Sequence, residues 1–249
     1  MNRLTGKTAV ITGANSGIGY ATAKEYIAQG AKVIITGRNK AAVEKAAAEL
    51  GNGTVAIHSD AGSMADVKAL AGKVQAFAKK IDILFVNAGV AKFLPISMVE
   101  EADFDEQFNI NVKGLYFTVK NLLPLINEGG SVILNASIVA HKGMANTSVY
   151  SATKAAVLNL GKTLSADLAP LKIRVNTISP GPIDTPIYSK LGMPETALNE
   201  FAVGMQQMVP LKRFGLAQEI AQAAVFFGSD ESSFVHGAEL IVDGGVLTV

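Results

Sequence analysis

Short apolar segments alternate with longer amphipathic segments along the chain. The apolar segments are rich in β-branched residues and too short for buried helices, so they predict strands buried on both faces. We expect strands at 8–12, 32–36, 54–58, 81–86, 131–135, 173–178 and 239–242. We expect helices at 18–29, 40–50, 63–79, 103–127, 149–168 and 217–227. The helix at 40–50 has clear ends, because Asn39 is a good N-cap residue and Gly51 can end a helix.

Strands alternating with helices in this way predict an α/β fold. We expect a single domain over residues 1–249, a Rossmann-type doubly wound parallel sheet of about seven strands with helices on both faces. Residues 180–214 interrupt the alternation with several prolines and many apolar residues. This segment follows the carboxyl end of the sixth predicted strand, where open α/β sheets bind ligands. We therefore expect an irregular substrate lid at about 182–214.

The composition excludes several classes of protein. The 22 basic and 21 acidic residues give a formal charge of +1 without a long basic run, so nucleic acid is not an expected partner. The chain has no cysteine, and its three histidines lack metal-ligand spacing. No apolar stretch reaches the roughly 18 residues of a membrane span, and the N-terminus does not resemble a secretory signal. We therefore expect a cytoplasmic protein with no membrane partner.

A glycine-rich loop joins the first predicted strand to the first predicted helix. Glycines let the backbone turn tightly and let a pyrophosphate approach the helix N-terminus, where free N–H groups favour an anion. The spacing is Gly-x3-Gly-x-Gly, which differs from the common dinucleotide fingerprint. The position of the loop still predicts nucleotide binding by Gly13, Asn15, Ser16, Gly17, Ile18 and Gly19.

The end of the second predicted strand bears on the choice of cofactor. A carboxylate there would hold the ribose of NAD(H), but the chain has Gly37 followed by Arg38. The Arg38 guanidinium can bind a 2′-phosphate, which favours NADP(H). NAD(H) stays possible, because an arginine can also stack on the adenine of either cofactor. Arg38 could also be an ordinary surface residue.

Tyr150 and Lys154 lie four residues apart at the start of a predicted helix, and so on one face of it. A nearby ammonium favours phenolate and should lower the pKa of Tyr150 toward working pH. Tyr150 is then a candidate general acid for a carbonyl oxygen. Ser137 follows the fifth predicted strand, and its hydroxyl could hydrogen-bond the same oxygen.

Together these segments resemble the short-chain dehydrogenase/reductase family over essentially the whole chain. The glycine loop, Asn87-Ala88-Gly89, Asn111, the Ser137–Tyr150–Lys154 set and the segment from Pro180 to Thr185 match the motifs of that family. The resemblance implies that Tyr150 exchanges the proton, Ser137 orients the substrate oxygen, and Lys154 binds the nicotinamide ribose. It implies that Asn111 holds a water molecule that relays protons to Lys154.

The resemblance also assigns further cofactor contacts along the chain. The residues implied are Asp60 and Ala61 at the adenine, Asn87, Ala88 and Gly89 at the ribose, and Pro180, Gly181, Ile183 and Thr185 at the nicotinamide. The chain departs from the family in two places. Ile138 replaces a second serine that many members have after Ser137, and Ser16 replaces a basic residue that many NADP-dependent members have. The expectation of NADP(H) therefore depends on Arg38 alone.

We interpret the protein as a ketone reductase that transfers hydride from a nicotinamide cofactor in a reversible reaction. Predicted substrate contacts are Ser137, Val139, His141, Met144, Tyr150, Tyr188, Leu191 and Met205, with Ala91 and Phe93 nearby. This mostly apolar lining suits a small hydrophobic or aryl ketone. His141 could equally be a surface residue.

Two alternatives stay open. A 3-oxoacyl-thioester reductase would need a basic face for an acidic carrier protein, to which Lys92, Lys113, Lys120 and Lys142 could contribute. A dinucleotide-sensing regulator would bind the cofactor without turnover, which the intact Ser137–Tyr150–Lys154 set argues against. The family resemblance also implies a homotetramer.

Overall fold

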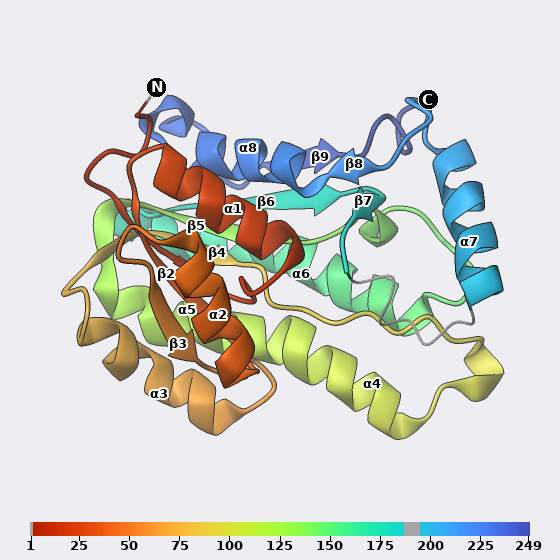
Figure 1. Ribbon diagram of the computed structural model, residues 1–249, viewed down its shortest axis with the longest axis horizontal. Helices are drawn as coiled ribbons and strands as arrows, with labels where there is room; N and C mark the ends of the chain where they lie inside the picture. The colour runs from red at the N-terminus through yellow and green to blue at the C-terminus, as the bar shows by residue number, and fades with distance from the viewer. Residues whose placement is uncertain (1, 187–194) are drawn as a thin grey trace.

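The computed structural model describes residues 2–186 and 195–249. Seven strands form one sheet in the order β3-β2-β1-β4-β5-β6-β9, with every neighbouring pair parallel (Figure 1). The strands are β1 (Thr8–Ile11), β2 (Lys32–Gly37), β3 (Val55–His58), β4 (Ile81–Val86), β5 (Ile126–Asn135), β6 (Arg174–Pro180) and β9 (Glu239–Val242). The predicted α/β fold with a doubly wound parallel sheet is confirmed.

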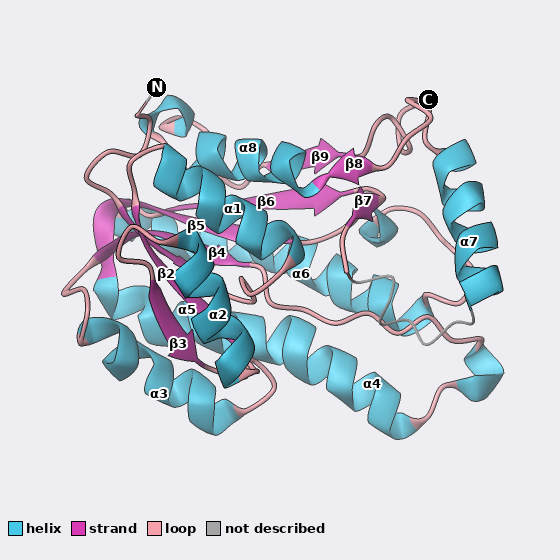
Figure 2. Ribbon diagram, viewed as in Figure 1, coloured by secondary structure: helices cyan, strands magenta, loops and turns pink. Residues whose placement is uncertain are grey.

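Helices cover both faces of this sheet, as Figure 2 shows. The α-helices are α1 (Gly17–Ala28), α2 (Lys40–Leu50), α3 (Met64–Gln75), α4 (Glu101–Phe108), α5 (Leu115–Leu122), α6 (Ser148–Leu168), α7 (Glu195–Met208) and α8 (Ala217–Gly228). One apolar layer packs α1, α2 and α8 against the sheet, with Tyr26 and Phe227 fully buried in it. The second packs α3, α5 and α6 against the opposite face, with Leu70 and Leu122 at its centre. Burial on both faces explains why the strand sequences are apolar throughout.

The strand order reverses direction between β1 and β4. The chain runs outward from β1 to β3 on one side, then returns to build β4, β5, β6 and β9 on the other side. The loops leaving the carboxyl ends of β1 and β4 therefore diverge and leave a crevice between them. Ligands bind at this switch point in open α/β sheets.

The predicted helix at 103–127 is helical as far as Leu122, but it differs from the prediction in an internal π-helical turn and in an earlier end. The segment comprises α4, a π-helical turn (Asn109–Gly114), α5 and a short 3-10 turn, and β5 already begins at Ile126. Gly114 packs so closely on the next layer that a Cβ there would lie 2.1 Å from the carbonyl oxygen of Ala61. The π-helical turn thus occurs where the helix meets the loop after β3, which carries Ala61.

The prediction that residues 182–214 are irregular is also wrong in part. The fourteen-residue helix α7 lies within the segment, and β7 (Ile183–Asp184) pairs in parallel with β8 (Gly215–Leu216) just beyond it. The pairing brings the two ends of the segment together beside β6, as Figure 2 shows. Among the described residues, no helix is long and apolar enough to cross a membrane.

Candidate active site

A cavity of about 600 Å³ lies at the switch point, along the carboxyl ends of the strands. Most of the residues predicted to bind a cofactor line this cavity. They are Gly13, Asn15, Ser16, Gly17, Ile18, Arg38, Asp60, Ala61, Asn87, Ala88, Gly89, Tyr150, Lys154, Pro180, Gly181, Ile183 and Thr185. The structure thus brings together five loops and helix α6, which are far apart in sequence.

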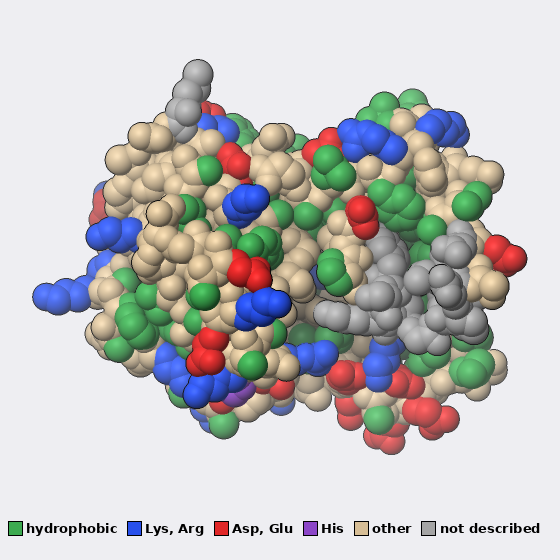
Figure 3. All heavy atoms as spheres, in the orientation of Figure 1, with side chains coloured by type: hydrophobic (Ala, Val, Ile, Leu, Met, Phe, Trp, Pro, Cys, Tyr) green, Lys and Arg blue, Asp and Glu red, His purple; other side chains and the backbone are tan. Residues whose placement is uncertain are grey.

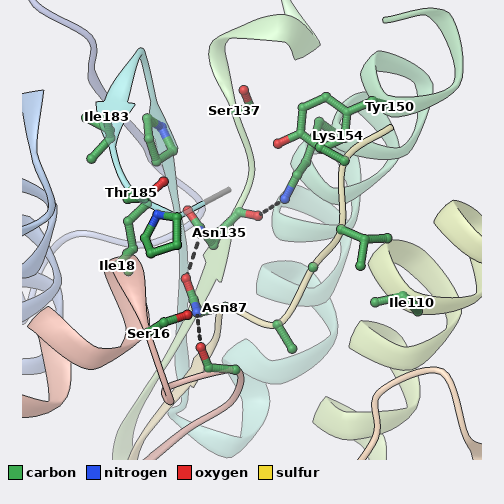
Figure 4. A pocket seen from close by; sticks show the side chains of 18 of the residues that line it. Ser16, Ile18, Asn87, Ile110, Asn135, Ser137, Tyr150, Lys154, Ile183 and Thr185 are labelled. Carbon is green, nitrogen blue, oxygen red and sulfur yellow. Dashed lines mark hydrogen bonds between the residues drawn. The ribbon is translucent and has the colours of Figure 1, made fainter. Parts of the chain in front are cut away.

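Asn87 joins the carboxyl ends of three strands beneath the cavity. Its side-chain Nδ2 donates to the carbonyl oxygens of Thr12 and Gly13, at 3.1 and 3.2 Å, and its backbone N–H donates to Thr12 Oγ1 at 3.0 Å. Its Oδ1 accepts a hydrogen bond from Asn135 Nδ2 at 2.9 Å (Figure 4). An amide is suited to this position, because it donates and accepts at once. Asn87 therefore holds the loop after β1 in place against β4 and β5.

The glycine loop fits tightly against the neighbouring loop. Gly13 has a φ of +65°, and a Cβ there would lie 2.8 Å from the Ala88 Cα. Gly19 does not line the cavity but lies behind it, where a Cβ would lie 2.6 Å from the Gly13 carbonyl oxygen. Both positions require glycine for close backbone packing. The loop ends at the N-terminus of α1, whose first N–H groups are free to bind an anion.

Ser137, Tyr150 and Lys154 face the same end of the cavity (Figure 4). Ser137 ends the segment after β5 and caps a 3-10 turn (Ile138–Ala140), while the other two residues lie one turn apart on α6. The Lys154 Nζ is 5.7 Å from the centre of the Tyr150 ring and donates to the Asn135 carbonyl oxygen at 2.8 Å. A hydroxyl, a phenol and an ammonium therefore converge on one region.

Burial changes the electrostatics of Lys154. Its side chain is almost completely buried, and this desolvation lowers the pKa of the ammonium from 10.5 to about 8. The group therefore lies close to its titration point at the pH at which most enzymes work. A side chain poised in this way can pass a proton on as well as hold a charge.

Asn111 is buried in the π-helical turn beside this group, outside the cavity wall. Its Oδ1 accepts from the Val90 N–H at 2.8 Å, and its Nδ2 donates to the Val90 carbonyl and to Thr153 Oγ1. Thr153 Oγ1 in turn donates to the carbonyl oxygen of Tyr150 at 2.7 Å. The Asn111 side chain thus fixes the loop after β4 against the turn that carries Tyr150. Its predicted part in a proton relay stays a prediction.

The substrate end of the cavity is mainly apolar. Val139, Met144 and Met205 line it, as predicted. Phe93 packs between Tyr150 and Phe201 of α7, with ring centres 5.7 and 6.2 Å apart. The other two residues predicted here, Tyr188 and Leu191, lie outside the described residues.

His141 corrects one of our expectations. It does not line the cavity; instead its imidazole Nε2 lies 2.8 Å from a carboxylate oxygen of Glu239 on β9. The 3-10 turn after Ser137 directs the His141 side chain away from the reacting region, toward the outer part of the sheet. His141 therefore lies outside the cavity wall that Val139 and Met144 help to form.

Sequence reasoning missed two features of the cavity. Asn135 lines it at the carboxyl end of β5 and is only 9% exposed. The signal was a polar residue closing an apolar strand beside Ser137. At the mouth of the cavity, Lys92 forms ion pairs with Asp103 and Glu106 of α4, at 2.9 and 2.6 Å. These hydrogen bonds raise the pKa of Lys92 and lower the pKa of Asp103.

The cavity fits a dinucleotide in its chemistry. One end carries Arg38 and Asp60, the middle is a glycine loop at a helix N-terminus, and the far end carries the Ser137–Tyr150–Lys154 group. Asn135 Oδ1 is buried and, among the described residues, has no hydrogen-bond partner. The fold and this site together define a dinucleotide-dependent oxidoreductase.

Comparison with known proteins identifies the family. A family model described as Enoyl-(Acyl carrier protein) reductase matches residues 13–247. The chain belongs to the short-chain dehydrogenase/reductase family. It is 39% identical to "Oxidoreductase asL5" of Sarocladium schorii, over 100% of this chain and 99% of that protein. It is 36% identical to "Dehydrogenase/reductase SDR family member 6" of Rattus norvegicus, over 98% of this chain and 99% of that protein.

A solved structure extends the comparison to three dimensions. The 3-ketoacyl-(acyl-carrier-protein) reductase of Brucella melitensis, complexed with NADH, matches with a TM-score of 0.88 and 34% identity. The match covers 98% of this chain and 99% of that chain. The fold class and the family expected from the sequence are thus confirmed, and the family implies a nicotinamide dinucleotide cofactor.

Proposed function

We propose that the protein reduces a ketone to a secondary alcohol, reversibly, with Tyr150 as the proton donor. The observation that carries this proposal is the buried Lys154 ammonium beside Tyr150 and Ser137, at one end of a cavity suited to a dinucleotide. The bound nicotinamide would supply the hydride. Ser137 holds the substrate oxygen, and Tyr150 gives it a proton. Lys154 favours the phenolate that remains and, once the cofactor is bound, holds its ribose.

We infer that the substrate is a small hydrophobic or aryl ketone. Val139, Met144, Met205 and Phe93 give the substrate end an apolar wall. Phe93 offers an aromatic face close to Tyr150, and the unbranched methionines can adapt to substrates of different shape. The segment at 182–214, which supplies Met205 from α7, would act as the lid over this pocket.

We propose NADP(H) as the preferred cofactor. Arg38 lines the adenine end of the cavity and can bind a 2′-phosphate. The neighbouring Gly37 carries no carboxylate, and a Cβ at that position would already lie 3.1 Å from Asn15 Oδ1. An acidic side chain that would select NAD(H) therefore has little room at Gly37.

The first experiment compares initial rates of NADPH and NADH oxidation with acetophenone as the ketone. We expect turnover, faster with NADPH. Tyr150→Phe should reduce kcat by at least about 10²-fold, because a general acid contributes about that much. Tyr20→Phe on α1 removes a phenol outside the cavity and is the matched control. Equal rates for wild type and Tyr150→Phe would refute the assignment of the proton donor.

A second candidate is reduction of a 3-oxoacyl group carried on an acidic carrier protein. The Brucella melitensis reductase described above favours it. The surface of this chain argues against it. Acidic side chains gather over α4, at the lower right of Figure 3, and include Glu100, Glu101 and Asp105. Lys92, expected to help dock the carrier, is instead paired with carboxylates. Turnover of acetoacetyl thioester but not of acetophenone would reverse this ranking.

We also propose that the protein forms a homotetramer. Phe104 of α4 is 46% exposed and Tyr116 of α5 is 40% exposed, beside a shallow surface pocket lined by Phe108, Val112 and Leu160. An apolar helical face of this kind would be covered by a second copy. Light scattering should give four times the chain mass of 25.9 kDa. The mass of a monomer would refute the proposal.

A further inference from the structure

His141 and Glu239 connect the turn that carries Ser137 to the edge of the sheet. The His141 Nε2–H donates to both carboxylate oxygens of Glu239, at 2.8 and 2.9 Å. The two residues are separated by 98 positions in the sequence. The Glu239 side chain is only 16% exposed, whereas that of His141 is 36% exposed. The contact is therefore partly shielded from water on the side of Glu239.

Glu239 is held rigidly on its own side. Its Oε1 also accepts a hydrogen bond from the hydroxyl of Ser179, at 2.5 Å, and Ser179 is fully buried on β6. The main chain of β9 pairs with β6 at this point, with Glu239 opposite Thr177. The carboxylate thus offers a fixed acceptor to a side chain that comes from the active-site turn.

The turn between Ser137 and His141 is short, so a shift of His141 also moves Ser137. Ser137 caps its start and His141 caps its end, and the Ala140 N–H donates to the Ser137 carbonyl at 3.0 Å. Ile138 and Val139 between them are buried. The hydrogen bond that Ser137 Oγ accepts from Val139 N–H is long, 3.4 Å. The place of the hydroxyl therefore depends on the backbone of this turn.

We propose that His141 and Glu239 are positioning residues for Ser137, which clamp its turn to β9. The proposal rests on the proposed function, in which Ser137 orients the substrate oxygen. Loss of the clamp lets the turn shift, and a displacement of about 1 Å can cost up to about 10²-fold in rate. Neither His141 nor Glu239 lines the cavity. Cofactor binding should therefore be unchanged.

The kinetic test uses two substitutions of the same residue. His141→Leu removes the donor and should lower kcat about tenfold with acetophenone and NADPH. His141→Gln keeps an N–H at a similar reach and should restore kcat to within about threefold of wild type. The Kd for NADPH, from fluorescence titration, should stay within about twofold in both variants. Lys142→Leu, which removes a charge from the next residue, is the matched control and should behave as wild type.

A double variant tests whether the two residues act through one contact. Glu239→Leu should also lower kcat, and adding His141→Leu to it should cause no further loss, because the contact is already absent. Equal loss in His141→Leu and His141→Gln would show a merely structural role and overturn the proposal. Wild-type kcat in His141→Leu would overturn it as well.

Amide hydrogen exchange separates failure of this proposal from failure of the proposed function. Peptides covering 137–147 should exchange about tenfold faster in His141→Leu than in wild type, and at the wild-type rate in His141→Gln. If wild type turns over no ketone, the proposed function fails and the exchange rates still decide whether the clamp exists. Unchanged exchange in His141→Leu would refute the clamp.

Discussion

The buried Lys154 should make the free energy of unfolding depend on pH, and a single substitution of Lys154 can measure its contribution. Burial lowers the pKa of this ammonium from 10.5 to about 8. In the unfolded chain the amine keeps its ordinary pKa, so between pH 8 and 10.5 the unfolded state binds a proton that the folded state does not. The free energy of unfolding then rises with pH across this window. The pKa difference corresponds to a cost of about 3 kcal/mol for keeping Lys154 charged at neutral pH.

Lys154→Met removes this titration. The variant loses the 2.8 Å hydrogen bond to the Asn135 carbonyl, which costs about 1–3 kcal/mol at every pH, so a single pH decides little. The pH dependence is decisive. We expect the unfolding free energy of wild type, minus that of Lys154→Met, to rise by about 2 kcal/mol from pH 7 to pH 9.5.

The measurement is urea unfolding followed by circular dichroism at fixed protein concentration, because an oligomer unfolds with concentration dependence. Lys162→Met, exposed on the same helix, is the control and should show a difference that does not change with pH. Burial also raises the pKa of Tyr26. Because Tyr26 is present in all three proteins, its contribution to the pH dependence cancels in the differences. If the difference in unfolding free energy between wild type and Lys154→Met does not change with pH, Lys154 is not desolvated. That result would also refute the electrostatic basis of the site.

Three further predictions follow from packing and charge. Tyr26→Phe removes a buried hydroxyl that donates to the Ala224 carbonyl at 2.9 Å. Urea unfolding should show that the free energy of unfolding falls by about 1–2 kcal/mol, and an unchanged value would contradict the hydrogen bond. Gly13→Ala places a Cβ 2.8 Å from the Ala88 Cα at a backbone φ of +65°. Fluorescence titration should therefore show that NADPH binds at least about tenfold more weakly, and wild-type affinity would contradict the close packing of the loop. Arg38→Ala removes the guanidinium at one end of the cavity, so the ratio of kcat/KM for NADPH over NADH should fall at least about tenfold; an unchanged ratio would count against the Arg38 assignment.

Elements with strong local signals could be predicted well from the sequence. The helix at 40–50 matches α2, where Asn39 Oδ1 accepts from the Ala42 N–H and Gly51 ends the helix at a φ of +65°. The strand at 81–86 matches β4, which is apolar because it is almost wholly buried. In these segments propensity, caps and burial agree with the final fold.

Elements set by distant contacts could not be predicted. The π-helical turn at 109–114 lies where Gly114 meets the Ala61 carbonyl, and β5 begins early because Ile126 pairs with Ile81. Helix α7 was missed because the surrounding prolines suggested irregular structure, although Pro194 and Pro210 only bracket it. Proline is tolerated just outside a helix and at its first turn.

The same distinction holds for the site. The glycine loop and the Tyr150–Lys154 pair could be predicted from sequence motifs, because each depends only on residue spacing within a short segment. The partner of His141 is Glu239, which only the pairing of β6 with β9 brings near. The role of Asn135 likewise depends on its hydrogen bond to Asn87, between the carboxyl ends of the neighbouring strands β5 and β4. Neither contact can be predicted from residues that are neighbours in the sequence.

In the proposed reaction, hydride passes to a ketone carbon while Tyr150 supplies the proton. The direct test is to incubate the protein with acetophenone and NADPH that carries deuterium at both C4 positions, and to analyse the 1-phenylethanol by mass spectrometry. Wild type should give alcohol that carries deuterium at the carbinol carbon, and Tyr150→Phe should give at least about 10²-fold less of it. Alcohol without deuterium, or equal labelled product from both proteins, would contradict the proposed reaction.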